Sequence, residues 1–427
     1  MNKSTADRLC CLMIFVLALS VPAATIAQQS SSGAASLTLD EALAEARNAN
    51  MQLPEARFRV EQALARVREA SGERYPKLSI EGDLHGGTPQ TYASDDAMGR
   101  VLLQTPIYTG GELRANIDRS HAEAESSLAG YQISIKEVDR AVRITYARML
   151  RDEATLALRE RAIARLQAYF IVVRARQAAG QGIAADVLRT QQRLTSAQAD
   201  LASAQLDLDQ DSMTLNDLLG RAPEEPLSIA AVPDPEPSRT SARQPWLVIP
   251  DVSQSDADVR AGQAGLQAAR AGRKPHVSLE ADVGAQSYGS GPAPLNNGTG
   301  TGAQVLLKFS VPLWDNGISR ARMDEAQAAL GEARQHKMIV ERTARLAWMQ
   351  AAGSIDTLYN EYRALRASAS TARDASLQAE SLYRGGQGTT LEVLDAYDAW
   401  LQANQALLDV IYKYHVAQAD MERWGTP

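Results

Sequence analysis

Cysteine is nearly absent from this 427-residue sequence, since its two cysteines, Cys10 and Cys11, both lie near the start. If the start is removed, a disulfide scaffold, a thiolate zinc site and a cysteine nucleophile are all excluded. Histidine is also rare, with 5 residues and no HxxxH or HxxH pair, so no metal-ligand spacing is visible. No GxSxG motif or other nucleophile constellation occurs either. We therefore expect a protein that is not an enzyme and that needs no cofactor.

A surplus of basic charge is missing as well. The 44 lysines and arginines are outnumbered by 51 aspartates and glutamates, which gives a net charge of −7. A general nucleic-acid binder usually carries a basic surplus, so no nucleic-acid partner is expected. Aromatic residues make up only 5%, which is low for a chain that is entirely a lipid-facing barrel with aromatic girdles. Hydrophobic residues reach 45%, which excludes a disordered chain.

The start of the chain has the layout of an export signal. Lys3 and Arg8 precede an apolar run from Leu9 to Val21, and small residues follow up to Ala27. This layout predicts a secretory signal peptide over residues 1–27. A transmembrane anchor is the alternative, but the run is short for a bilayer span. Because no other long apolar run exists, any membrane crossing by the mature chain is expected to use β-strands.

Several short motifs occur twice. Gly180-Gln181-Gly182 recurs 206 residues later as Gly386-Gln387-Gly388, and Pro106-Ile107-Tyr108 recurs at the same offset as Pro312-Leu313-Trp314. Self-similarity at a fixed offset indicates an internal repeat. We predict two tandem units, residues 28–220 and 251–427. The segment between them, residues 221–250, contains seven prolines and is predicted to be a linker or an irregular surface segment.

Each unit contains two runs in which apolar and polar residues alternate. The four runs lie near residues 78–84, 100–107, 277–283 and 304–313. Alternation with period two predicts β-strands with one apolar and one polar face. Their length of about nine or ten residues suits a tilted transmembrane strand. The polar segments Gly86–Ala97 and Tyr288–Gly302 are predicted to be the connecting loops.

The remainder is helical with a seven-residue period. Ile135, Val142, Met149, Leu156, Ile163 and Phe170 are spaced by seven, and similar series run from Val187 to Leu215 and from Val393 to Met421. A sustained heptad predicts left-handed supercoiling of packed helices. The helix between the strand end and the glycine turn would be roughly 100 Å long. A further helix is predicted at about residues 54–74, ahead of the first strand.

Four amphipathic strands cannot close a barrel alone, and open sheet edges cannot face lipid. We therefore expect strands from several chains to close one barrel, with the long helices extending below it as coiled coils.

The order, duplication and spacing of these motifs resemble those of the outer-membrane efflux proteins, the TolC-type channel components of tripartite export systems. The resemblance covers nearly the whole mature chain, from Leu39-Asp40-Glu41-Ala42-Leu43 and Tyr75-Pro76-Lys77-Leu78 to both glycine turns. It implies a homotrimer with a twelve-stranded barrel, four strands per chain, in outer-membrane lipid, and a coiled-coil helical tunnel in the periplasm. It also implies passive conduction to the exterior, with energy from an inner-membrane pump coupled through a periplasmic adaptor.

The resemblance assigns the two glycine turns to adaptor docking. The docking tips would be Gly180, Gln181, Gly182 and Ile183, together with Gly386, Gln387, Gly388 and Thr389. Simple turn chemistry is the alternative, because glycine tolerates the positive φ that ends a helix. Ile183 favours docking, because an apolar side chain on an exposed tip would otherwise reduce solubility.

A periplasmic gate is expected just after the second turn. Glu392 and Asp395 are spaced i, i+3 and share a helix face, so three chains would supply a ring of six carboxylates that attracts cations. A solvated helix start is the alternative. By resemblance these two residues line the gate, and Asp186 and Tyr383 help keep it closed. Gly388 replaces the arginine expected as their partner, and Arg189 is then the nearby arginine of the first unit that could substitute for it.

The polar strand faces carry a further set of candidates. Glu81, Asp83, His85, Glu280 and Asp282 all fall on these faces and are predicted to line the barrel lumen. Wetting the pore is favoured over a metal site. A periplasmic coiled-coil scaffold or adaptor without a pore remains the alternative for the whole chain, but a scaffold does not need four strands. A diffusion porin is disfavoured by the dominance of helix.

Overall fold

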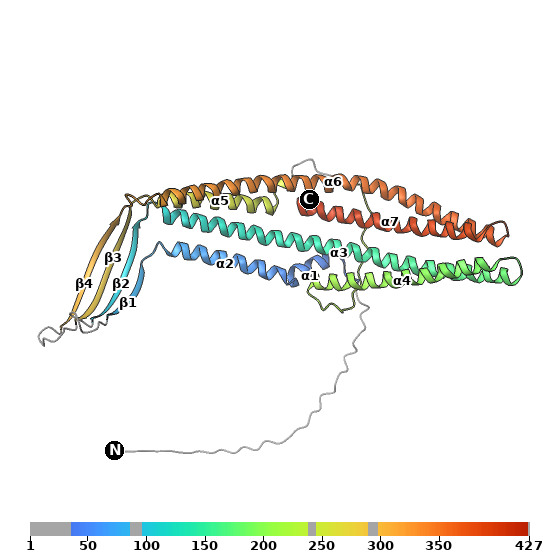
Figure 1. The fold of residues 1–427 in the computed structure, drawn as a ribbon, viewed down its shortest axis with the longest axis horizontal. Coiled ribbons are helices and arrows are strands. Elements are labelled where there is room, and N and C mark those ends of the chain that lie inside the picture. The colour runs from blue at the N-terminus through green and yellow to red at the C-terminus, as the bar shows by residue number, and fades with distance from the viewer. Residues whose placement is uncertain (1–35, 86–95, 238–244, 289–297, 426–427) are drawn as a thin grey trace, which may run out of the picture.

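The computed structural model describes residues 36–85, 96–237, 245–288 and 298–425, and the predicted signal peptide lies outside these ranges. The molecule is an elongated rod with a sheet at one end and two helical turns at the other (Figure 1). After α1 (Leu39–Ala49), the chain runs through α2 (Gln52–Gly72), β1 (Lys77–His85), β2 (Asp96–Tyr108), α3 (Glu112–Ala178) and α4 (Ala184–Leu219). A short 3₁₀ turn, η1 (Pro245–Leu247), precedes α5 (Pro250–Ala271), β3 (His276–Tyr288), β4 (Gly298–Ser310), α6 (Ile318–Arg384) and α7 (Thr390–Trp424).

The order helix, hairpin, long helix, returning helix therefore occurs twice. The two long helices, α3 and α6, have 67 residues each, which corresponds to about 100 Å and confirms the length expected between the strand end and the glycine turn. Each long helix begins directly after a glycine with positive φ, Gly111 at 94° and Gly317 at 87°. Glycine adopts this conformation without a steric penalty, so the chain can turn from strand to helix there. Among the described helices, none contains a stretch long and apolar enough to cross a bilayer.

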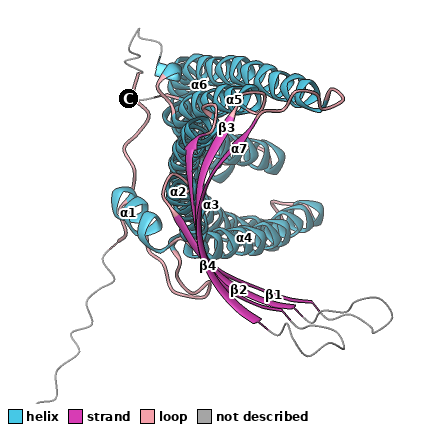
Figure 2. Cartoon of the chain, turned by 90° about the vertical axis from the view of Figure 1, so that its left-hand side faces the viewer, coloured by secondary structure: helices cyan, strands magenta, loops and turns pink. Residues whose placement is uncertain are grey.

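The four strands form one antiparallel sheet in the order β1-β2-β3-β4. Figure 2 shows them leaving the helices as a single twisted layer. The register aligns Glu81 with Arg100, Arg100 with Gly284, and Gly284 with Gly302. Directly opposed residues share a face, so one face is mostly polar as predicted, although Leu102 and Leu306 also lie on it, opposite Asp282 and Glu280.

The predicted strand lengths and loops need correction. β1 has 9 residues, but β2, β3 and β4 have 13 each. β4 begins at Gly298, so the run Gly298–Gly302 pairs with β3 and does not belong to the loop. Alternation of hydrophobicity could not detect this part, because glycine and threonine carry no apolar signal while their backbones still pair. The loop residues 86–95 and 289–297 lie outside the described ranges.

The middle of the rod has its own core, built from α1, α3, α4 and the proline-rich segment. Leu37 and Ile229 form a parallel bridge, and the hydroxyl of Tyr146 lies 2.8 Å from the Leu37 carbonyl and 2.7 Å from that of Ala230. Tyr146 is fully buried beside Leu215 and Leu219. These contacts attach the described part of the proline-rich segment to the long helices.

Near the C-terminus, one buried arginine connects three helices. Arg423 on α7 is 3% exposed, and its guanidinium lies 2.7 Å from Glu137 of α3 and 2.8 Å from Asp251 of α5. The second unit is thereby fixed to the first by a charge that is paired on both sides.

Candidate functional site at the helical tips

Both glycine turns lie at the end of the rod remote from the sheet (Figure 1). They share one hydrogen-bond pattern. Gln181 N donates to Arg176 O and Gln387 N donates to Leu382 O, both at 2.9 Å, while Gly180 and Gly386 adopt φ of 74° and 79°. This is the Schellman arrangement that closes the last carbonyls of a helix.

The third residue of each turn must also be small. A Cβ on Gly182 would lie 3.2 Å from Gln177 N, and one on Gly388 would lie 3.1 Å from Tyr383 N. Turn chemistry therefore accounts for the glycines. It does not account for Ile183, whose side chain is 63% exposed, or for the exposed glutamines 181 and 387.

The two turns differ in how they start the next helix. Thr389 caps α7 with a capping box, in which Glu392 N donates to Thr389 Oγ1 at 3.3 Å and Thr389 N donates to Glu392 Oε2 at 2.8 Å. Ile183 occupies the matching position before α4 and makes no side-chain cap. Glu392 thus has a helix-starting role in addition to the predicted one, whereas Asp395 is exposed.

Tyr383 lies in the apolar cluster between the two helical hairpins, where it is 5% exposed. Its ring meets that of Tyr169 edge to face at 5.2 Å. Burial raises the pKa of the Tyr169 hydroxyl, so this phenol stays protonated. Asp186, in contrast, is partly exposed on the first turn of α4.

Arg189 contacts Asp186, one of its two expected partners. Its Nη1 lies 3.7 Å from Asp186 Oδ1 on the same helix, so this contact joins neither hairpin to the other. The arginine that reaches Tyr383 is Arg176, on α3. Its Nη1 donates to the Tyr383 carbonyl oxygen, and its guanidinium carbon lies 4.7 Å from the centroid of the Tyr383 ring.

Several other arginines of the first hairpin also reach the second, and two of them, Arg165 and Arg193, lie in the half of the hairpin nearer the tips. Arg165 Nη2 donates to Ser376 Oγ at 3.1 Å, and its guanidinium lies 4.7 Å from the ring of Trp400. Arg193 on α4 forms an ion pair with Asp398 on α7. Burial raises the pKa of the Asp398 carboxyl, and the Arg193 charge opposes that rise.

We call Arg165, Arg176 and Arg193 the arginine seam. Sequence reasoning missed it, although one signal was present. At the 206-residue offset the matching positions are Thr371, Leu382 and Ala399, so the repeat is broken at all three places.

The predicted lumen residues lie together on the polar face of the sheet. Glu81 Oε2 accepts from Arg100 Nε at 2.8 Å, and Asp282 Oδ1 accepts from Gln304 Nε2 at 2.7 Å. Glu280 lies 3.6 Å from Lys308 Nζ. Asp83 is exposed on the same face of β1, while the side chain of His85 lies outside the described residues. This face therefore carries mixed charge with a partner for most carboxylates.

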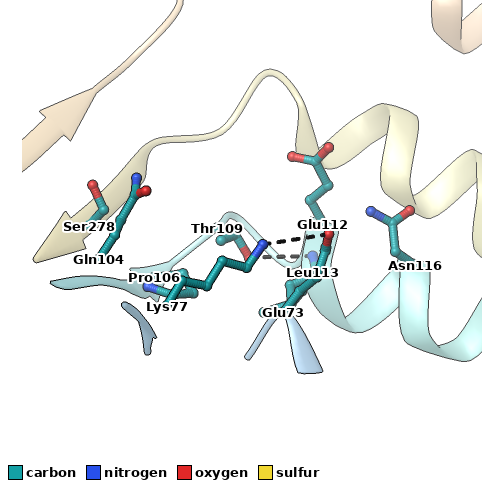
Figure 3. A pocket seen from close by; sticks show the side chains of 9 residues that line it. All are labelled: Glu73, Lys77, Gln104, Pro106, Thr109, Glu112, Leu113, Asn116 and Ser278. Carbon is teal, nitrogen blue, oxygen red and sulfur yellow. Dashed lines mark hydrogen bonds and ion pairs between the residues drawn. The ribbon is translucent and has the colours of Figure 1, made fainter. Parts of the chain in front are cut away.

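A recess of about 300 Å³ lies where the sheet meets the helices (Figure 3). Lys77 extends across it toward Glu73 at 4.0 Å, and Glu112 faces it from the start of α3. Glu112 also lies 2.9 Å from His276 Nε2. The charged side chains that line the recess, Lys77 and Glu112, are thus already paired with Glu73 and His276. Within the described ranges, no three His, Cys, Asp or Glu side chains are grouped so as to hold a metal ion.

Comparison with known proteins agrees with this geometry. Residues 42–221 and 249–424 both match the sequence model of the family described as Outer membrane efflux protein. The outer membrane protein OprJ of Pseudomonas aeruginosa is 25% identical over 405 residues, which cover 88% of this chain and 81% of that protein. The cation efflux system protein CusC of Escherichia coli K12 is 24% identical, covering 89% and 84%.

Solved structures show the same fold. A crystal structure of CusC superposes with a TM-score of 0.82 at 21% identity, over 91% of this chain and 92% of that one. VceC of Vibrio cholerae superposes with a TM-score of 0.79 at 18% identity, over 91% and 96%.

Proposed function

The chain belongs to the outer membrane efflux protein family and is an outer-membrane transport protein, and from this premise we propose that three copies form one passive export duct. Their twelve strands would close a barrel in the membrane, and their long helices would form a tunnel in the periplasm. An inner-membrane pump and a periplasmic adaptor would supply cargo and energy. Relatives carry names as different as cation efflux and pyoverdine export, so we assign the choice of cargo to the pump.

The observation that carries this proposal is the open sheet. Within the described sheet, β1 and β4 each have one neighbouring strand, which leaves two unsatisfied edges. The apolar face is exposed as well, with Ile80 at 84% and Val305 at 74%. Unpaired strand edges are costly in lipid and in water, and a bare apolar face is costly in water. Pairing β4 of one copy with β1 of the next would remove the edges and leave the apolar face outward toward lipid.

The acidic residues after the second turn would form the periplasmic gate. Glu392 and Asp395 lie on the first turns of α7, and Asp398 follows one turn later. Threefold repetition would bring these carboxylates around one axis and favour cations there. Asp186 and Tyr383 would contribute to the closed state from the facing elements.

This gate is tested by conductance in planar bilayers. Glu392→Gln removes the charge but keeps the capping box, which accepts glutamine in place of glutamate. Combined with Asp395→Asn, it should reduce cation selectivity and weaken block by multivalent cations. The matched control is Asp207→Asn on the exposed face of α4. Unaltered selectivity in the double variant would show that these carboxylates do not form the constriction.

The tips would dock the adaptor, and the structure supplies a variant that separates docking from folding. Ile183 precedes α4 without capping it, whereas aspartate is among the best N-cap residues. Ile183→Asp should therefore stabilise α4 by roughly 0.5–2 kcal/mol while placing a charge on the proposed docking surface. We expect export to be lost with assembly intact.

Thr389→Asp is the corresponding variant of the second turn, since it exchanges one good cap for another. Export assays in cells, with assembly followed in detergent extracts, provide the measurement. Normal export from both variants would remove the docking assignment. An assembly that fails to form would instead point to a structural role for the tips.

A further inference from the structure

The arginine seam is contributed by one hairpin only. All three of its arginines belong to the first hairpin, and each reaches α6 or α7 of the second. Arg176 is the member nearest the tips, since the Cβ position of Gly386 lies 3.9 Å from its Nη2. It is thus the arginine best placed to control how the two turns sit against one another.

Arg176 connects the two turns through two backbone carbonyls, its own and that of Tyr383, and each of these carbonyls also accepts a hydrogen bond within its turn. Its own carbonyl accepts Gln181 N and closes the first turn, at 2.9 Å. Its guanidinium donates to the carbonyl of Tyr383, which also accepts Gly386 N at 3.0 Å and so closes the second turn. A hydrogen bond from a charged donor is stronger than a neutral one. Loosening this contact would therefore disturb the second turn directly.

The ring of Tyr383 adds a second contact of a different kind. It lies against the Arg176 guanidinium at 4.7 Å and meets the Tyr169 ring at 5.2 Å. Both partners belong to α3, so one helix holds the ring twice. Cation–π attraction acts on the ring face and does not need the tyrosine hydroxyl.

We propose that Arg176 is the positioning residue that latches the α6–α7 turn onto α3 in the closed duct, in place of an arginine at position 388. This inference rests on the proposed function, because only a duct with a periplasmic gate has a closed state. The latch acts through the backbone carbonyl and the ring of Tyr383. A Cβ on Gly388 would lie tightly against Tyr383 N, at 3.1 Å, whereas Arg176 reaches the same turn from the other hairpin.

The latch is tested first by the separation of the two turns. Cysteines introduced at Gln181 and Gln387, both exposed, would carry spin labels, because the native cysteines 10 and 11 lie in the predicted signal peptide. Pulsed electron resonance then gives the distribution of distances in detergent-extracted protein. We expect a narrow distribution in the parent and a longer, broader one in Arg176→Ala. An unchanged distribution would overturn the proposal.

Matched variants identify the contact. Tyr383→Phe keeps ring and carbonyl and should leave the distances unchanged, whereas Tyr383→Leu removes the ring and should broaden them. If Tyr383→Phe opened the turns as far as Arg176→Ala, the hydroxyl would be the link and the proposal would be wrong. Arg174→Ala, at an exposed arginine two residues earlier on α3, should have no effect, and an equal effect there would also refute the latch.

Conductance distinguishes failure of the latch from failure of the duct. Arg176→Ala should raise single-channel conductance in planar bilayers severalfold, and Arg174→Ala should not. A longer distance between the labelled turns in Arg176→Ala, with no conductance in that variant or in the parent, would support the role of Arg176 and reject the proposed duct. If the parent conducts, and Arg176→Ala changes neither the conductance nor the distances between the turns, the role of Arg176 is rejected and the duct is not.

Discussion

Two buried carboxyl groups face each other between α3 and α4, and they predict a specific dependence of stability on pH. Asp152 is 4% exposed and Asp211 is 8% exposed. Arg151 donates to Asp152 Oδ1 at 2.7 Å, and Arg148 donates to Asp211 Oδ1 at 3.3 Å. Asp152 Oδ2 is buried and accepts no hydrogen bond from the described residues. We expect a proton shared between the two carboxyls to satisfy that oxygen.

Burial, followed by the hydrogen bond to Asp211, raises the pKa of Asp152 from 3.8 to about 6, although the Arg151 guanidinium opposes the rise. Between about pH 4 and pH 6, the folded chain therefore keeps a proton that the unfolded chain has lost. Since the folded state binds more protons there, stability falls as pH rises through this window. The shift of roughly two units corresponds to at most about 3 kcal/mol.

The perturbation that tests this reasoning is Asp152→Asn. Asparagine is neutral at every pH and can donate to Asp211, so the loss of stability between pH 4 and 6 should shrink. At pH 7 the variant should exceed the parent by up to about 3 kcal/mol. The control is Asp207→Asn, at an exposed aspartate of α4, which should keep the parent's dependence.

The assay is thermal unfolding of detergent-extracted protein, followed by helical circular dichroism at half-unit steps from pH 4 to 7. The difference between parent and variant isolates Asp152 from other raised carboxyls such as Asp398. Parallel pH profiles for parent and Asp152→Asn, or an asparagine variant less stable at pH 7, would refute the shared proton.

Three further substitutions have predictable costs in the same unfolding assay. Arg423→Met leaves Glu137 and Asp251 without their shared cation and should destabilise by about 3 kcal/mol, and no loss of stability would show that the two carboxylates are well solvated. Gly220→Ala places a Cβ 2.5 Å from Ala49 O at φ of 72°, so we expect a loss of about 1–3 kcal/mol and reject the strain if the variant melts with the parent. Thr389→Ala removes the α7 cap and should cost about 1 kcal/mol, whereas Thr389→Ser should not.

Sequence predicted the elements that depend on local periodicity. The predicted helix between the end of the first hairpin and the first glycine turn agrees with α3 to within two residues at each end, and its heptad is typical of a packed helix. The glycine turns were found because Gly-Gln-Gly recurs at an offset of 206, and the positive φ of Gly180 and Gly386 explains the need for glycine there. The polar strand faces followed from alternation. The separate helix α1 was missed, although Thr38 and Glu41 form a capping box before it.

What could not be predicted depends on how distant helices are rotated about their axes. Arg176 meets Tyr383 across 207 positions of sequence, and its neighbour Arg174 is exposed. A heptad defines the apolar seam but not which polar residue beside it meets which partner. The partner of Tyr383 was therefore sought near Asp186, where sequence spacing is short, and the structure places it on α3, the helix before the first glycine turn.

The number of chains in the membrane-extracted particle tests the central claim most directly, namely that this sheet closes only with copies of itself. Its mass should be measured in detergent or in lipid nanodiscs by native mass spectrometry. We predict three copies, with β4 of one chain crosslinked to β1 of the next when cysteines are placed on those edges. A stable single copy, without crosslinks between chains, would contradict the account.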